Sequence, residues 1–192
     1  MKTPLLSICL GTWASLSVSA QPLLTWTELE QATNYPSVDL AISEKDKATK
    51  LSLYTPGETF SERVALITNL QALHANRLYI KYLPNTLATL PRLQWLELRN
   101  NWIAQLPDNF GDLASMRRLD LRGNWFEQFP TPITKLATLE WLDISQNRID
   151  SLPNELFNCK EIKYLDIHKN KIKNFPSQFT NLLTILGHMM LG

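Results

Sequence analysis

One interval of 23 residues recurs through most of this chain, and it constrains the fold more than any other feature of the sequence. Four segments follow the form Leu-x-x-Leu-x-Leu-x-x-Asn, with Ile or Met at some of the leucine positions, and they begin at Leu93, Met116, Leu139 and Ile162. A second marker keeps the same interval, because prolines stand at Pro84, Pro107, Pro130, Pro153 and Pro176. Two independent markers with one shared period predict an array of stacked repeats.

The residues inside one repeat indicate how the chain runs. The Leu-x-Leu alternation has the period of a β-strand, so the leucines face one side and their neighbours face the other. One such strand is too short to be stable alone, but strands from successive repeats can stack as a parallel sheet. The Leu-Pro step then ends a turn, and the apolar residues after it pack the outer side as a short helix or an extended segment.

The ninth repeat position carries an asparagine where the chain must leave the strand. An inward-pointing amide at this place can bond backbone groups that the turn leaves unpaired. We therefore expect a ladder of buried side chains formed by Asn101, Asn124, Asn147 and Asn170.

The full pattern, L-x-x-L-x-L-x-x-N-x-I/F-x-x-L/F-P-x-x-I/L/F-x-x-L, resembles the 23-residue class of leucine-rich repeats, the Ras-group type that is also common in bacterial proteins. The resemblance covers about six repeats over residues 48–184. It implies an α/β fold, a leucine-rich-repeat solenoid with a curved parallel sheet on its concave face and short helices or extended segments on its convex face. It also implies an interaction scaffold that is not an enzyme, without specifying a partner.

Both ends of the array depart from the pattern. A first unit, one residue shorter than the others, fits Leu51, Leu53, Phe60, Val64 and Ile67. Before it, we expect residues 21–47 to form an N-terminal capping segment, in which residues 25–32 make a short helix that covers the open end of the core. After the array, residues 185–192 form an incomplete terminal repeat. With a one-residue shift, a further strand begins there with Leu186, Met189 and Leu191.

The incomplete terminal repeat leaves three alternatives open. An uncapped edge strand invites pairing, so copies of the chain can associate through this end. The chain can equally be a fragment of a longer receptor or effector, or the product of a decayed gene. The sequence does not choose among these alternatives.

Residues 1–20 have the pattern of a secretion signal. Lys2 supplies the positive start, an uncharged and largely apolar stretch follows, and Val18-Ser19-Ala20 places small residues before a cleavage site at Gln21. The apolar stretch is short for a membrane span, although an uncleaved N-terminal anchor remains the alternative. We expect a secreted or periplasmic protein with no integral membrane span once the signal is removed.

Composition and cysteine content exclude several classes of function. The 19 basic and 18 acidic residues give a net charge of +1, which offers no electrostatic reason to expect nucleic acid as a partner. The sequence has no Cys/His cluster with zinc spacing, and we expect no metal and no cofactor. Removal of the signal leaves Cys159 as the only cysteine, so no intramolecular disulfide can form. Cys159 takes the repeat position of Leu113 and Leu136, which predicts a buried structural side chain.

Stacking converts each strand position that points away from the leucines into a column on the concave face. The third position carries Ala72, Trp95, Arg118, Trp141 and Tyr164, and the fifth carries His74, Glu97, Asp120, Asp143 and Asp166. The seventh position carries Asn76, Arg99, Arg122, Ser145 and His168, and the tenth, just beyond the strand, carries Tyr79, Trp102, Trp125, Arg148 and Lys171. We predict that a partner contacts Trp95, Glu97, Arg99, Trp102, Arg118, Asp120, Arg122, Trp125, Trp141, Asp143, Tyr164, Asp166 and His168.

Exposed aromatic side chains flanked by acids and arginines are typical of a protein-binding surface. A second interpretation makes the aromatic column a platform on which sugar rings stack. The simplest structural alternative is that the aromatic side chains pack over one another and over the arginine stems. The aspartate column suggests a cation or acid–base site, but aspartate in Leu-Asp-Leu is commonplace in repeats that resemble this one, and we expect Arg99, Arg118 and Arg122 to neutralise part of its charge. We therefore predict protein binding and no catalytic residues.

Overall fold

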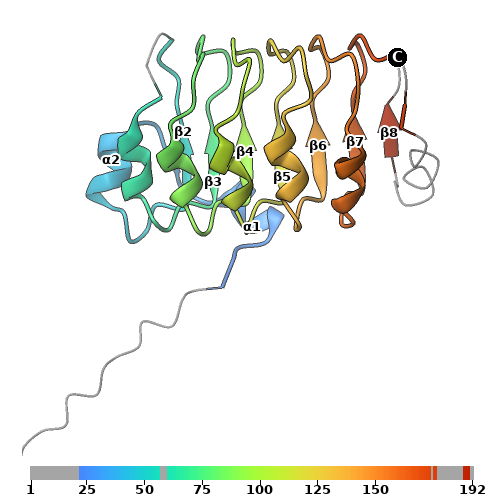
Figure 1. The fold of residues 1–192 in the computed structure, drawn as a ribbon. Coiled ribbons are helices and arrows are strands. Elements are labelled where there is room, and N and C mark those ends of the chain that lie inside the picture. The colour runs from blue at the N-terminus through green and yellow to red at the C-terminus, as the bar shows by residue number, and fades with distance from the viewer. Residues whose placement is uncertain (1–21, 57–59, 174, 177–187, 191–192) are drawn as a thin grey trace, which may run out of the picture.

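The computed structural model describes residues 22–56, 60–173, 175–176 and 188–190. The predicted signal at residues 1–20 lies outside these residues, as do Leu186 and Leu191. Successive repeats lie side by side in chain order, with the sheet behind a row of short helices in the view of Figure 1. The predicted solenoid is therefore confirmed.

A single parallel sheet runs through the described part of the chain, with its strands in sequence order. Its members are β1 (Asn34–Tyr35), β2 (Lys50–Ser52), β3 (Ala72–His74), β4 (Trp95–Glu97), β5 (Arg118–Asp120), β6 (Trp141–Asp143), β7 (Tyr164–Asp166) and β8 (His188–Met190). From β3 to β7 the register advances by one repeat a strand, so that Trp95 pairs with Arg118 and Arg118 with Trp141. Equivalent repeat positions therefore become neighbours in space.

Within the described residues, the convex side carries one short 3-10 helix in each repeat from β2 to β6 (Figure 1). These are η1 (Glu62–Leu66), η2 (Asn85–Thr89), η3 (Asp108–Asp112), η4 (Thr131–Lys135) and η5 (Asn154–Asn158). From η2 onward the residue before each helix is the periodic proline, at Pro84, Pro107, Pro130 and Pro153. Proline fits this position because its fixed φ suits a helix start and its missing N–H would have no partner there.

The core lies between the sheet and these helices. Leu96, Leu119, Leu142 and Leu165, at the fourth repeat position, are completely buried. The degraded first unit is confirmed, because Leu51, Val64 and Ile67 are buried in the same core and Lys50 pairs with Ala72, an advance of 22 residues. Cys159 is buried as predicted.

The asparagine ladder is present in every repeat for which it was predicted. The amide oxygen of Asn124 accepts from the Ile103 N–H at 3.1 Å, while its amide nitrogen donates to the carbonyls of Leu98 and Leu121 at 2.9 Å each. Asn101, Asn147 and Asn170 make the corresponding bonds. Each rung therefore joins its own repeat to the preceding one through backbone groups.

The residue before each asparagine position adopts a left-handed backbone conformation. These residues are Arg77, Asn100, Gly123, Gln146 and Lys169, with φ between 53° and 69°. Glycine and asparagine tolerate this region, whereas arginine, glutamine and lysine pay a steric penalty in it. The sharp exit from the strand thus depends on an unfavourable residue in three repeats.

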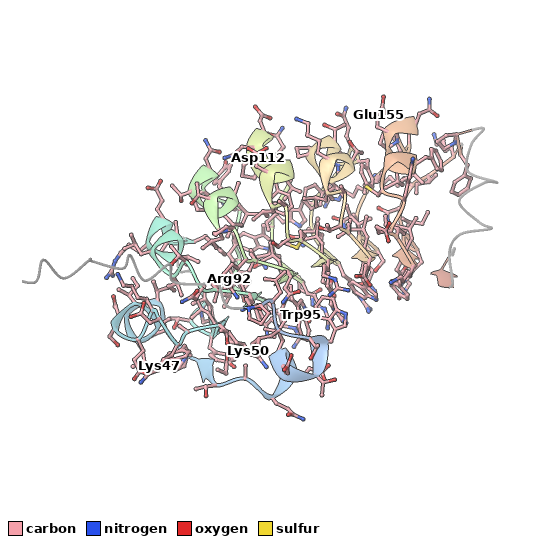
Figure 2. All side chains as sticks on the ribbon, turned by 90° about the horizontal axis from the view of Figure 1, so that it is seen from below. Lys47, Lys50, Arg92, Trp95, Asp112 and Glu155 are labelled. Atoms are coloured by element: carbon pink, nitrogen blue, oxygen red, sulfur yellow. The ribbon has the colours of Figure 1, made fainter. Side chains whose placement is uncertain are left out.

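The N-terminal segment differs from its prediction in one respect. Helix α1 (Trp26–Gln31) forms as expected, with Thr25 and Glu28 making a capping box. It does not cover the end of the core, however, because it lies on the opposite side of the sheet from the 3-10 helices (Figure 2). The end is covered by α2 (Val38–Ser43), which packs against η1, and by β1, which pairs with β2 (Figure 1).

The predicted strand of the terminal repeat is present as β8. Leu165 pairs with Met189, so the register advances by 24 residues and the one-residue shift is confirmed. Among the described residues, no helix is sufficiently long and apolar to cross a lipid bilayer.

Candidate partner-binding face

We define the concave face as the side of the sheet that carries the third, fifth and seventh repeat positions, opposite the 3-10 helices. Part of this face is already occupied by residues 22–31, which we call the strap. The backbone N–H of Leu24 donates to Gln71 Oε1 at 2.8 Å, and Gln94 Nε2 donates to the Leu24 carbonyl at 2.8 Å. Lys50 Nζ and an Arg92 guanidinium nitrogen bind the carbonyls of Glu30 and Pro22.

The strap buries apolar side chains in a cluster separate from the main core. Leu29 is fully buried and packs with Ala72 and Trp95, while Leu24 and Trp26 lie at the margin of the cluster. Figure 2 shows Trp95 between the sheet and α1. The prediction that Trp95 faces solvent is therefore wrong: its side chain points out of the sheet as expected, but the strap reduces its exposure to 7%.

The acidic column at the fifth position is also less accessible than predicted. Glu97, Asp120, Asp143 and Asp166 are all buried. Asp120, Asp143 and Asp166 accept from the backbone N–H groups of Arg122, Ser145 and His168, two residues further along. These carboxylates therefore organise the strand ends and offer little surface to a partner.

Arginine neutralises part of this acidic column. Arg99 forms ion pairs with Asp120 and, at 3.5 Å, with Glu97. Burial and the neighbouring Asp143 nevertheless raise the pKa of Asp120 to about 6, even though Arg99 acts in the opposite direction. At the other end of the column, Asp166 lies 2.5 Å from His168 Nδ1.

Beyond the strap, the third-position column forms a continuous stack. The Arg118 guanidinium lies 4.9 Å from the Trp95 ring centroid and 4.2 Å from that of Trp141. Trp141 in turn stacks on Tyr164 with 4.8 Å between centroids and nearly parallel planes. Arg118, Trp141 and Tyr164 are partly exposed, so this stretch of the column is open to a partner.

A hollow of about 190 Å³ lies on the concave face between this stack and the strap. It is lined by Trp26, Arg118, Glu140, Trp141, Lys163 and Tyr164. Glu140 and Lys163 occupy the second repeat position, just before the strands, and are joined by a 2.9 Å ion pair. The hollow is therefore placed at the beginning of strands β5 to β7.

The tenth-position aromatic residues form a separate row in the loops that follow the strands. The ring centroid of Trp102 lies 4.8 Å from that of Tyr79 and 5.5 Å from that of Trp125. Lys81 approaches the ring of Trp102, and Arg148 approaches the ring of Trp125. Trp102 and Trp125 are exposed by 36% and 43%, as predicted for solvent-facing residues. A second hollow, of about 740 Å³, lies beside this row and includes Trp125 and Arg148 in its wall.

Several residues of the face were not assigned to it from the sequence. Trp26 and Leu29 of the strap, and Gln71, Gln94, Glu140 and Lys163 at the second repeat position, all contribute to it. The spacing of Trp26 and Leu29 was a usable signal, because residues three apart lie on one side of a helix and both are apolar. The second position gave no signal, since its side chains differ from repeat to repeat.

Two further observations concern possible metal ligands and the single described cysteine. Among the described residues, no three His, Cys, Asp or Glu side chains come together in a way that could hold a metal ion. Burial raises the pKa of the Cys159 thiol to about 11, and its Sγ lies 3.6 Å from the Ile133 carbonyl oxygen. These surroundings are those of a buried structural cysteine.

Comparison with protein families gives two matches. Residues 137–187 match the model of a family described as Leucine rich repeat, and residues 92–113 match a second model with the same description. No curated protein sequence matches the chain.

Solved structures of low sequence identity share the fold. Internalin C2 from Listeria monocytogenes is similar with a TM-score of 0.67 and 24% identity, over 78% of this chain and 64% of that one. Internalin inlF from the same organism is similar with a TM-score of 0.65 and 21% identity, over 83% of this chain and 46% of that one. The plant peptide hormone receptor RGFR1, solved in complex with RGF2, is similar with a TM-score of 0.60 and 22% identity, over 74% of this chain and 25% of the receptor. The chain thus spans between a quarter and two thirds of these proteins' lengths.

Proposed function

Because this chain is a leucine-rich repeat protein, we propose that it binds a protein partner and that the partner lies on the concave face beyond the strap. One observation carries the proposal: the strap, a peptide segment, is already bound to this face by backbone hydrogen bonds and by a buried leucine. The adjoining part of the same face offers partly exposed aromatic and arginine side chains, which are enriched at the energetic centres of interfaces.

The residues of the predicted site take two roles in this proposal. The partner contacts those with exposed surface on the face, namely Arg99, Arg118, Arg122, Trp141, Tyr164 and His168. The buried residues Trp95, Glu97, Asp120, Asp143 and Asp166 hold those side chains in place. Trp102 and Trp125 belong to the loop row and extend the surface if the partner is large.

Peptide recognition by a related fold supports this assignment. The plant receptor RGFR1, to which this chain is similar with 22% identity, was solved in complex with a peptide hormone. That complex shows that a solenoid of this architecture can bind a peptide. The partner of the present chain is an independent question.

Capture of partners from the native extracellular medium tests the proposal. The wild-type protein is compared with a Trp141→Ala/Arg122→Ala variant and with a control variant, Tyr82→Ala, whose side chain is 83% exposed and outside the repeat positions that form the face. We expect partners to be lost from the first variant and retained by the control. An unchanged set of partners in both variants would show that the concave face is not the binding surface.

Carbohydrate binding is the alternative left open by the aromatic residues. Sugar rings stack on free aromatic faces, but Trp102 and Trp125 face each other, and Trp141 faces Tyr164 and Arg118. This arrangement favours a protein partner. A glycan array decides between the two, since strong sugar binding that disappears in Trp141→Ala would favour the carbohydrate function.

We propose no catalytic activity for this face. Hydrolysis by the purified protein that is lost in Asp143→Asn or His168→Ala would contradict this assignment.

We propose secretion on the basis of the pattern in residues 1–20, and N-terminal sequencing of the exported protein should begin at Gln21. We also propose self-association through β8, which stands at the edge of the sheet among the described residues, and sedimentation at several concentrations measures it.

A further inference from the structure

We infer that the hollow beside the strap binds a carboxylate carried by an extended peptide segment of the partner, with Arg118 as the principal contact. This inference rests on the proposed function and specifies the chemistry that its site recognises. The carboxylate comes either from an acidic side chain or from the C-terminus of the peptide.

The strap indicates why the occupant is an extended peptide. Gln71 and Gln94, which stand at the second position of successive repeats, bind the N–H and the carbonyl of Leu24. The same column continues past the strap as Arg117, Glu140 and Lys163, and the last two line the hollow. A segment that follows the strap along this column therefore meets hydrogen-bonding side chains at each further repeat.

Arg118 is the feature that selects a carboxylate. Its guanidinium is held between the rings of Trp95 and Trp141, which fixes its plane. Within the described part of the chain it forms no ion pair and no side-chain hydrogen bond, and its Nε is buried without an acceptor. A planar guanidinium with unused donors matches the two oxygens of a carboxylate.

Two other arginines of the face differ from Arg118 because they are already paired, and Arg122, at the far end of β5, does not line the hollow. Arg99 binds Asp120, and Arg117 binds Glu140. Some of their N–H donors are therefore already used by carboxylates of the protein itself. Arg118 is therefore the arginine of this part of the face that remains available for a ligand.

The charges around the hollow also favour an anion. Three cations, Arg117, Arg118 and Lys163, surround the single carboxylate of Glu140, which is shared between Arg117 and Lys163. The acids on the same strands, Asp120, Asp143 and Asp166, stand at the far ends of β5, β6 and β7 and accept hydrogen bonds from backbone N–H groups just past those ends. The beginning of these strands thus carries a net positive charge.

Selection from random peptide libraries on the full chain tests the inference. One library has a free C-terminus and the other a C-terminal amide, so the two sources of a carboxylate are distinguished. We expect the selected peptides to share an acidic residue at a fixed position or to require the free C-terminus. Replacement of that group by Gln, Asn or an amide should weaken binding about tenfold or more, as expected for a charge-assisted hydrogen bond.

Arg118→Gln should abolish the difference between the acidic and the neutral peptide. The matched control is Arg148→Gln, which also removes an arginine stacked on a tryptophan, Trp125, but outside the hollow. The control should keep the full difference. The affinities of the acidic and the neutral peptide are measured on the same variant, so a general loss of stability affects both equally. Thermal unfolding verifies that each variant is folded.

Three results would overturn the inference: selected peptides without a shared acid or terminal carboxylate, an Arg118→Gln variant that still discriminates, or failure of both libraries to yield a binder. None of these results tests the proposed function. The partner-capture experiment tests it separately, because it changes Trp141 and Arg122 and leaves Arg118 in place. The two proposals can therefore fail separately.

Discussion

The indole of Trp26 stands edge-on against the indole of Trp95, with 5.8 Å between ring centroids and 88° between ring planes. This contact joins a segment before the repeats to the fourth strand of the sheet. Edge-to-face geometry is favourable for aromatic pairs, because the positive ring edge approaches the negative ring face. It makes the strap a component of the concave face, and its consequences can be measured.

Leu29→Ala should detach the strap without unfolding the repeats. Leu29 is fully buried against Ala72 and Trp95, but it belongs to a cluster separate from the main core. Its truncation removes much of the apolar contact that holds the strap, so Trp95 becomes exposed to water. We expect a red shift of tryptophan fluorescence and faster proteolysis within residues 22–31, with the cooperative unfolding of the array preserved.

The matched control for Leu29 is Leu23→Ala, because Leu23 lies in the same strap but is 43% exposed. It should leave both the fluorescence and the proteolysis unchanged. A Leu29→Ala spectrum identical to that of the wild type would contradict the docked position of the strap.

Asn124→Ala should lower the free energy of unfolding by on the order of 1–3 kcal/mol. The change leaves the Ile103 N–H and the carbonyls of Leu98 and Leu121 without their side-chain partner inside the core. Urea denaturation measures the loss. The exposed Asn154→Ala serves as the control, and an equal effect in both variants would argue against the ladder.

Gln146→Gly should stabilise the protein by about 0.5–1 kcal/mol. Glycine removes the steric cost of the left-handed backbone conformation, and this gain exceeds the opposing loss from the greater entropy of glycine in the unfolded chain. Gln146 has a φ of 55° and is partly exposed. Gly123→Ala should have the opposite sign, because its φ is 69° and an added Cβ would collide with Oδ1 of Asn100. Thermal unfolding of both variants decides the point, and changes of the same sign would refute it.

Asp120 should make stability depend on pH. Burial raises the pKa of Asp120 to about 6 in the folded protein, above its ordinary value of 3.8. The folded state then binds more protons than the unfolded state between these values, so this group's contribution to stability is fully present below pH 3.8 and is lost as the pH rises through about 6.

The measurement for Asp120 is denaturant unfolding of the wild type and of Asp120→Asn across the range from pH 4 to pH 7. The difference in free energy between the two proteins should change by on the order of 1–3 kcal/mol across this range, in favour of the variant at the higher pH. Asp112→Asn, at an exposed position of η3, should show no such trend. A flat difference for Asp120→Asn would contradict the raised pKa.

Local repetition explains why so much of the fold could be predicted. Leu96, Leu119 and Leu142 are all fully buried because strands with a common period stack in register, so one repeat fixes the environment of the next. Asn124 and Pro130 likewise serve a turn that lies within their own repeat or an adjacent one. The direction in which Arg118, Trp141 and Tyr164 point follows from the alternation along a strand.

The accessibility of the same face could not be predicted in this way. Whether Trp95 is open to solvent depends on residues 22–31, which have no periodic relation to it, and the contact between Trp26 and Trp95 spans 69 positions (95 − 26). Similarly, the ion pair of Asp120 is made with Arg99, which follows the neighbouring strand β4.

The sequence alone determined the repeat, the strand register, the asparagine ladder and the side of the sheet on which each residue lies, because all of these follow from local spacing. Only the tertiary structure decided that the strap covers Trp95, that Arg99 and Arg117 are paired while Arg118 is not, and that a hollow lies beside them. These features arise from packing between segments remote in the chain, where small differences in shape and charge select one arrangement among many.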